Sequence, residues 1–241
     1  MKKIYKLFML VMVMIILGGC SKNENELVMV TEAGFAPYEY YDNNEIVGVD
    51  IDIANEIAKE LNKKLVVKDV AFDSIINEVK SGKADFGAAG ISYNDERAKQ
   101  VDFSINYTIS KQVVIVKENS SIKSVKDVSN QKIAVQLGSV ADTLLTEDYP
   151  KVTLVREKKY LAAIQDLKDS KVDAVVMDEL PAKEMIKNNN NLIILDGSLA
   201  EDSYGMVVKK DNKELLDAIN KVLERLVNDG KIDDFIIEHT K

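Results

Sequence analysis

The chain alternates between short apolar runs and segments with helical periodicity, and this alternation constrains the fold more than any other feature. Apolar runs at 27–30, 65–67 and 83–90 predict β-strands, and the segments between them predict helices. Strands that alternate with helices usually pair in parallel. We therefore expect an α/β protein with mostly parallel sheets flanked by helices.

The same alternation starts again after residue 117. Strands are predicted at 132–136, 152–155 and 172–177, and an amphipathic helix is predicted at 212–229. The chain has 241 residues, which allows two domains of about 100 residues each. The sequence thus predicts two α/β units.

A candidate anion site follows the apolar run at 83–90, which ends in small residues that let a ligand approach the backbone. Asn94 can cap a short helix, and a helix N-terminus offers free N–H groups to an anion. Arg97 lies in that helix, and its guanidinium suits bidentate binding of a carboxylate. Only three of the 32 basic residues are arginines, so generic surface charge does not explain Arg97.

Two further candidate positions lie at predicted strand ends. Ligands of open parallel sheets bind beyond the carboxyl ends of the strands. Residues 138–140 follow the strand at 132–136, and Asp178 follows the strand at 172–177. Because a buried charge needs a partner, Asp178 is a candidate for binding a charged group.

The first 20 residues predict an export signal rather than part of the fold. Lys2, Lys3 and Lys6 precede an apolar stretch at 7–17, which is too short to span a bilayer. We therefore expect a signal peptide over 1–20.

The end of this segment, Leu-Gly-Gly-Cys, resembles the lipobox of bacterial lipoproteins, in which the cysteine carries a lipid. We expect Cys20 to anchor the protein to the outer side of the bacterial cell membrane, with a tether over 21–26. An ordinary secretory signal with a chance cysteine is the alternative. Cys20 is the single cysteine, so no disulfide can form within the chain.

The acidic composition excludes some partners. The formal net charge is −8, and it becomes more negative when the three lysines of the leader are left out. An acidic body with few arginines argues against nucleic-acid binding and against direct adsorption to an anionic membrane surface.

Four segments resemble, in the same order, the solute-binding receptors of bacterial ABC importers for polar amino acids. They are GVDIDIANEIAKEL, FDSIINEVKSGKADFGAAGISYNDERAKQVDFS, IAVQLGS and VDAVVMDE. The resemblance implies a two-lobe, periplasmic-binding-protein-like fold of type II that closes on one amino acid. It also implies a monomer that performs no covalent chemistry, needs no cofactor or metal, and delivers its ligand to a membrane permease.

The resemblance also implies where the lobes divide. The first lobe is expected over 27–109 and 203–241, and the second over 110–202. The hinge strands are expected near 108–112 and 202–206.

The resemblance assigns the head group of the ligand to four residues. Arg97 is expected to bind the α-carboxylate, and Asp178 the α-ammonium. Ser92 and the backbone of Gly90 are expected to bind the same head group. The structural alternatives are a surface ion pair for Arg97, a helix cap for Asp178 and a turn serine for Ser92.

The side chain of the ligand is assigned to a second group of residues. Phe35 is expected to stack on it, with Phe72 as the facing wall or as a core residue. Glu32 matches an acid near the distal end of the ligand, and a surface glutamate is its alternative.

A third group follows the strand at 132–136. Gly138 and Ser139 are expected to offer N–H groups to the α-carboxylate. Val140 stands where many relatives have threonine or serine, so one hydroxyl contact is lost there.

Glu32 and Glu39 favour a polar or cationic ligand. Arginine or lysine is expected first because an acid that faces a desolvated cation gains most, and glutamine or cystine is possible. A small dehydratase-type enzyme and a sensory protein are the alternative functions. Asp50 is attributed to the helix dipole, and the one histidine, His239, to a disordered tail.

Overall fold

The structure is a computed structural model that describes residues 24–187 and 189–240. The predicted signal peptide at 1–20 and its Cys20 lie outside the described residues, as does the first half of the tether at 21–26. Among the described residues, no helix is long and apolar enough to cross a membrane.

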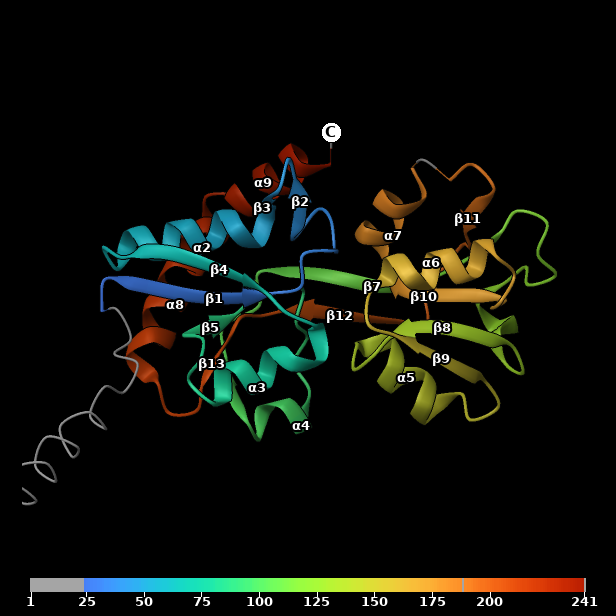
Figure 1. The fold of residues 1–241 in the computed structure, drawn as a ribbon, viewed down its shortest axis with the longest axis horizontal. Coiled ribbons are helices and arrows are strands. Elements are labelled where there is room, and N and C mark those ends of the chain that lie inside the picture. The colour runs from blue at the N-terminus through green and yellow to red at the C-terminus, as the bar shows by residue number, and fades with distance from the viewer. Residues whose placement is uncertain (1–23, 188, 241) are drawn as a thin grey trace, which may run out of the picture.

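Two sheets lie side by side and form two lobes (Figure 1). The strands of the first sheet, in spatial order, are β4 (Lys64–Asp69), β1 (Glu26–Thr31), β5 (Phe86–Gly87), β13 (Val207–Lys209) and β6 (Val101–Phe103). The strand β1 pairs in parallel with β4 and β5, and β13 runs antiparallel to β5 and β6.

Alternate side chains of β1 explain why both faces of the first sheet are covered. Leu27 and Met29 pack into the cluster under α2 (Val49–Glu60) and α8 (Lys213–Asn228), whereas Val28 and Val30 pack against α3 (Ile75–Lys80). This period of two is the strand pattern, and it buries apolar surface on each face.

Shorter elements complete the first lobe. They are the hairpin of β2 (Tyr40–Asp42) and β3 (Glu45–Val47), the 3-10 helix η2 (Phe72–Ser74), and the helices α4 (Asp95–Ala98) and α9 (Lys231–His239). Asn43 and Asn44 form the turn of this hairpin with φ of 47° and 70°, which asparagine tolerates better than most residues.

The second sheet runs β11 (Leu192–Ile194), β7 (Thr108–Lys117), β10 (Ala174–Asp178), β8 (Lys132–Gln136) and β9 (Thr153–Glu157), and β12 (Ala200–Tyr204) also pairs with β7. The strands β10, β8 and β9 are parallel, whereas β7 is antiparallel to its neighbours. The flanking helices are η3 (Val125–Val128), α5 (Val140–Asp148), α6 (Tyr160–Lys168) and α7 (Glu179–Ile186).

The chain passes between the two sheets twice. It leaves the first sheet after β6 and enters the second at β7, and it returns between β12 and β13. The strands β7 and β12 pair antiparallel, with Thr108 opposite Tyr204 and Gln112 opposite Ala200. This pairing lies where the hinge was expected, and the exact lobe boundaries stay a prediction.

The strand predicted at 83–90 is much shorter in the structure. Only Phe86 and Gly87 form β5. Gly90 has φ of 55°, a left-handed conformation that ends the extended run, and its N–H donates to Asp50 Oδ2 at 3.3 Å. The small residues therefore form a turn at the carboxyl end of β5 rather than a long strand.

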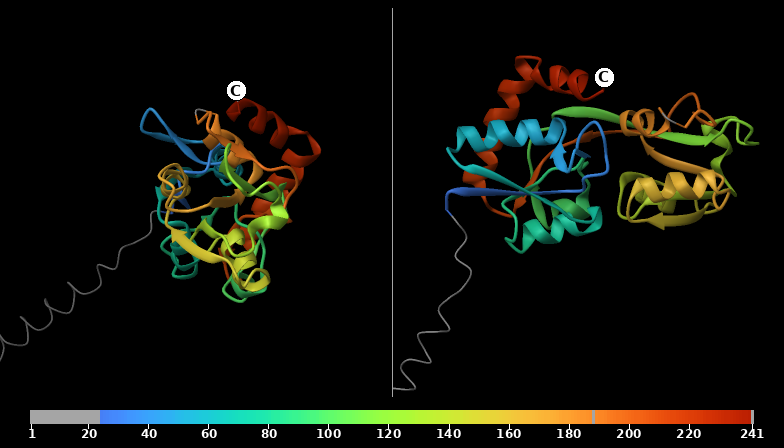
Figure 2. Two further views of the ribbon diagram at one scale, coloured as in Figure 1. Left: turned by 90° about the vertical axis from the view of Figure 1, so that its right-hand side faces the viewer. Right: turned by 45° about the horizontal axis from the view of Figure 1, so that its top comes forward.

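The expectation of a disordered tail around His239 is wrong. The ring accepts or donates at both nitrogens, with Tyr40 OH 3.0 Å from Nδ1 and Asp52 Oδ2 2.8 Å from Nε2. These contacts fix α9 against α2 and the β2–β3 hairpin. Figure 2 shows the C-terminal helices packed on the first lobe.

Candidate ligand-binding site

A narrow cleft lies between the two lobes and is nearly closed, with a cavity volume of only about 10 Å³. The first lobe lines it with seven residues and the second with five: Glu32, Phe35, Glu39, Phe72, Ala89, Gly90 and Arg97, then Gln136, Ser139, Val140, Tyr160 and Asp178. Most of the predicted site residues therefore meet in one cleft. Ser92 and Gly138 lie behind its lining.

Arg97 is held at the cleft by a capped helix and two carbonyl groups. Asn94 Oδ1 accepts the Arg97 N–H at 2.7 Å, which confirms the predicted cap of α4. The guanidinium donates to the Ser92 carbonyl at 2.5 Å and to the Gly138 carbonyl at 2.8 Å, and it lies 5.5 Å from the Phe72 ring centre. Burial lowers the pKa of Arg97 to about 10, so it remains a cation at neutral pH.

Asp178 is fixed by residues of the two crossing strands. Its Oδ1 accepts hydrogen bonds from Ser110 Oγ at 2.8 Å, Gln112 Nε2 at 2.9 Å and Tyr204 OH at 2.6 Å. Although Asp178 occupies the N-cap position of α7, its side chain makes no capping bond. The helix-cap alternative is therefore not what the structure shows.

Burial is the main cause that raises the pKa of Asp178, and the nearby carboxylate of Asp202 raises it further. Gln112 Nε2 also donates to Asp202 Oδ2 at 3.0 Å. A cationic group in the cleft would relieve the repulsion between these two acids.

Glu32 contacts the second lobe through both of its oxygens. Lys159 Nζ lies 3.0 Å from Oε1, and Gln136 Nε2 donates to Oε2 at 3.2 Å. Glu32 is 1% exposed, which contradicts the surface alternative. Burial raises the pKa of Glu32, although Lys159 opposes that effect.

Glu39 is a second acid in the lining and is fully buried. No N–H group and no hydroxyl group of the described residues donates to either of its carboxylate oxygens, and its hydrogen-bonding neighbour is the carboxyl group of Asp50. Burial, followed by the charge of Asp50, raises the pKa of Glu39 well above its usual range. Glu39 is thus a buried acid without a cationic partner among the described residues.

Asp50 lies behind this acid and has a role that the helix dipole does not explain. It accepts hydrogen bonds from Tyr107 OH at 2.7 Å and from the Gly90 N–H. Burial nevertheless raises the pKa of Asp50 to about 6. The side chains of Asp50 and Glu39 share a hydrogen bond, and the charge of Asp50 disfavours ionisation of Glu39.

Aromatic rings form one wall of the cleft. Phe35 stacks on Tyr38 at a centroid distance of 6.1 Å and, across the lobes, on Tyr160 at 5.8 Å. Phe72 is partly buried and lines the cleft on the side of Arg97, so it is not a plain core residue. The expected stacking of Phe35 on a ligand stays a prediction.

The turn at 138–140 holds α5 in place. Ser139 Oγ caps the helix by accepting the Asp142 N–H at 3.2 Å, and Asp142 Oδ2 accepts the Gly138 N–H at 3.0 Å. The Ser139 N–H donates to the Gln136 carbonyl. Both N–H groups that were expected to bind a carboxylate thus have acceptors within the protein, while Ser139 and Val140 line the cleft.

Sequence reasoning missed several residues of this site. Gln136, Tyr160 and Lys159 belong to the second lobe, far from Glu32 and Phe35 in sequence. No spacing rule connects residues that meet only when two lobes are assembled. The position of Gln136, a polar residue at the end of a buried strand, was the one sequence signal that could have indicated a binding residue.

Comparisons with known proteins agree with this architecture. Residues 27–239 match the bacterial extracellular solute-binding proteins, family 3. The chain is 29% identical over 220 residues to the arginine-binding extracellular protein ArtP of Bacillus subtilis, covering 90% of this chain and 86% of ArtP.

Two solved structures are similar to the whole fold. One is the amino acid ABC transporter substrate-binding protein AbpA of Streptococcus pneumoniae bound to L-arginine, with a TM-score of 0.86, 36% identity, and coverage of 90% of this chain and 95% of AbpA. The other is an ancestral arginine-binding protein bound to glutamine, with a TM-score of 0.84, 39% identity, and coverage of 90% and 99%.

Proposed function

The chain belongs to family 3 of the bacterial extracellular solute-binding proteins, as an amino-acid-binding component of an ABC transporter, and we propose that its ligand is a cationic amino acid, arginine before lysine. The relatives are transport proteins, not enzymes. The coarse function follows from the family, whereas the ligand is argued from the cleft.

The head group of an amino acid fits the charges at one end of the cleft. The Arg97 guanidinium would exchange its bonds to the Ser92 and Gly138 carbonyls for a bidentate bond to the α-carboxylate. The three hydrogen bonds to Asp178 all reach Oδ1, which leaves Oδ2 for the α-ammonium. These two residues come from different lobes, so one head group would join both.

The charge of the lining favours a cationic side chain. The lining has three carboxylates, Glu32, Glu39 and Asp178, and one guanidinium, Arg97. A zwitterionic head group adds no net charge, and Lys159 neutralises Glu32 from outside the lining. The buried carboxyl group of Glu39, which has an acid and no cation as its neighbour among the described residues, is the observation that carries the proposal, because one cationic side chain would complete the balance.

A neutral polar ligand such as glutamine is the second candidate. The raised pKa of Glu39 favours its neutral form, and a neutral carboxyl can exchange hydrogen bonds with an amide. The ancestral relative bound to glutamine supports the same possibility. The competition between the two ligands therefore depends on whether Glu39 is ionised in the complex.

We also propose that the protein is anchored outside the cytoplasm by a lipid on Cys20 and that its lobes close around the ligand before delivery to a permease. Support comes from the lipobox-like sequence and from the two strand crossings between the lobes. Metabolic labelling with a fatty acid should mark the wild-type chain and not a Cys20→Ser variant.

A thermal-shift panel of the twenty amino acids, ornithine and cystine tests the ligand assignment. Ligand that binds only the folded state raises the melting temperature by mass action. We expect arginine to give the largest shift, lysine or ornithine the next, and glutamine a smaller one. A larger shift with glutamine than with arginine would reverse the ranking, and no shift with any of them would refute amino-acid binding.

A further inference from the structure

Among the ion pairs of the described residues, one lysine of the second lobe contacts two carboxylates of the first lobe. This lysine is Lys159. Its Nζ lies 3.0 Å from Glu32 Oε1 and 3.5 Å from Asp69 Oδ2. Glu32 directly follows β1, and Asp69 ends the neighbouring strand β4, where it pairs with Thr31. The two acids therefore lie side by side at one edge of the first sheet.

The first lobe holds these acids ready for a cation. Asp69 Oδ1 accepts the Ala33 N–H at 2.9 Å, and Asp69 Oδ2 lies 3.3 Å from Tyr41 OH, which donates to it. Glu32 is held in the lining, where it is almost without solvent contact. Two adjacent carboxylates repel each other, and a cation placed between them lowers that repulsion.

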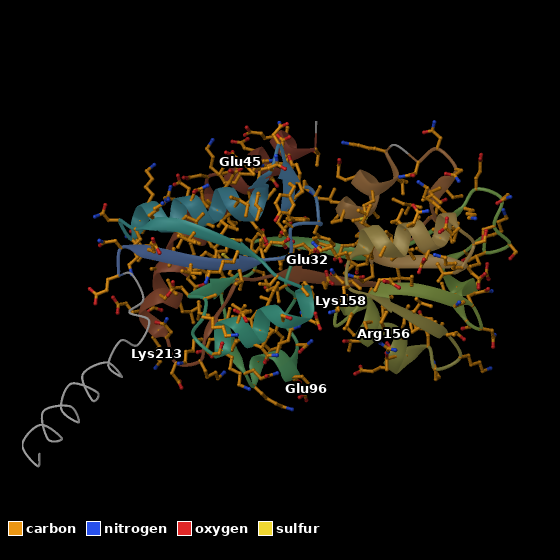
Figure 3. The ribbon with its side chains drawn as sticks, viewed as in Figure 1. Glu32, Glu45, Glu96, Arg156, Lys158 and Lys213 are labelled. Carbon is orange, nitrogen blue, oxygen red and sulfur yellow. The ribbon has the colours of Figure 1, made fainter. Side chains whose placement is uncertain are left out.

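The second lobe holds the ammonium group in position. Lys159 directly precedes α6, and the next residue, Tyr160, is buried and stacks on Phe35. Gln136 Nε2 donates both to Glu32 Oε2 and to the Lys158 carbonyl at 3.0 Å. Figure 3 shows Glu32 and Lys158 at the junction between the lobes.

Lys159 does not line the cleft, and its side chain is 45% exposed. It therefore contacts Glu32 from the rim, outside the lining to which Glu32 itself belongs. The contact requires that the two lobes approach each other, but it does not require any particular ligand side chain.

We propose that Lys159 is a further affinity-determining residue, which holds the cleft closed by forming an ion bridge to Glu32 and Asp69. We call these three residues the rim bridge. In this assignment Glu32 belongs to lobe closure and Glu39 to the recognition of the ligand side chain. The rim bridge then strengthens the binding of every ligand by a similar factor.

The first test measures closure without ligand, so it does not depend on the proposed function. Spin labels on cysteines at positions 64 and 168, in the full chain with Cys20→Ser, report the distance between the lobes. Lys159→Met should reduce the population at the short distance. Lys158→Met is the matched control, because Lys158 is adjacent and exposed and its side chain makes no ion pair that the structure shows.

The second test uses titration calorimetry with arginine and with glutamine. Lys159→Met should weaken both ligands by a similar factor, about three- to tenfold, since one partner of the bridge is half exposed. Lys159→Arg should restore most of the affinity. Higher salt should reduce the difference between the wild type and Lys159→Met.

Three results would overturn the rim bridge. One is an unchanged distance distribution in ligand-free Lys159→Met. Another is tighter arginine binding by that variant, which would show that Lys159 competes with the ligand for Glu32. The third is additive effects of Lys159→Met and Glu32→Gln on the closed population, because partners in one bridge must be coupled. If neither amino acid binds the wild type, the proposed function fails, and the distance measurement still decides on the bridge.

Discussion

Replacing Glu39 by glutamine should convert a site for cationic ligands into one for neutral ligands. Glu39 is fully buried, lines the cleft, and has no cationic partner among the described residues. Glutamine keeps the size of the side chain and removes the charge. The substitution therefore tests the charge of Glu39 with little change in packing.

The magnitude follows from two opposing contributions. Removing one member of a buried charge pair costs about 3–5 kcal/mol. In the wild type, however, Glu39 must first lose a proton that burial and Asp50 help it to retain, at about 1.4 kcal/mol for each pKa unit above the working pH. The net loss for arginine should thus be smaller than about 3–5 kcal/mol, and each ~1.4 kcal/mol of it is tenfold in affinity.

The same protonation makes arginine binding dependent on pH. Because the pKa of Glu39 is raised, lowering the pH protonates Glu39 before an exposed glutamate, and the charge that binds a guanidinium is lost. The ratio of arginine affinity to glutamine affinity should fall as the pH falls through this raised pKa. Arginine binding below that pKa should also release a proton, which calorimetry detects in buffers of different ionisation enthalpy.

A suitable control is Glu45→Gln, which removes an exposed charge from the β2–β3 hairpin of the same lobe (Figure 3). It should leave both affinities unchanged. Equal arginine affinity in the wild type and in Glu39→Gln, with no proton release in either, would refute the assignment of Glu39 to a cationic ligand.

Three further predictions concern the head-group site and the turn beside it. Arg97→Ala should weaken every amino-acid ligand by roughly a thousandfold, and near-normal affinity by calorimetry in a folded variant would contradict its role. Asp178→Asn should flatten the pH dependence of ligand-free stability, because the raised pKa of Asp178 contributes stability that is full below its unfolded pKa and is lost as the pH rises through its folded pKa. The melting temperature of the variant should therefore decline less than that of the wild type between pH 4 and pH 8. An identical decline in both proteins would exclude this contribution. Gly90→Ala should lower the free energy of unfolding by about 1–3 kcal/mol, because Gly90 has φ of 55° and a Cβ there would lie 2.8 Å from Phe35 Cε1; an unchanged midpoint in urea would show that the turn can relax.

Local patterns were enough to predict most of the fold. The apolar run at 27–30 and the helical period at 212–229 placed β1 and α8 within a few residues of their observed bounds. The run at 83–90 was harder, because its length depends on Gly90 and on the distant Asp50. A strand propensity cannot report a hydrogen bond from another part of the chain.

The candidate site was predictable only where one segment carries its own chemistry. Arg97 was found because Asn94 caps its helix within four residues. Lys159 carried no such signal, since its partners Glu32 and Asp69 lie more than 80 residues away. Glu39 was seen as an acid, but its burial depends on how Asp50 and the aromatic residues pack around it.

The position of β13 has a consequence for the order in which the chain can fold. The second sheet is built entirely from 108–204, so its strands are all present before the last part of the chain is synthesised. The first sheet cannot form in full until Val207–Lys209 inserts between β5 and β6, strands that lie about 100 residues earlier. Such distant pairing has a high contact order and slows folding. The late arrival of one central strand therefore keeps the first lobe incomplete until nearly all of the polypeptide is available.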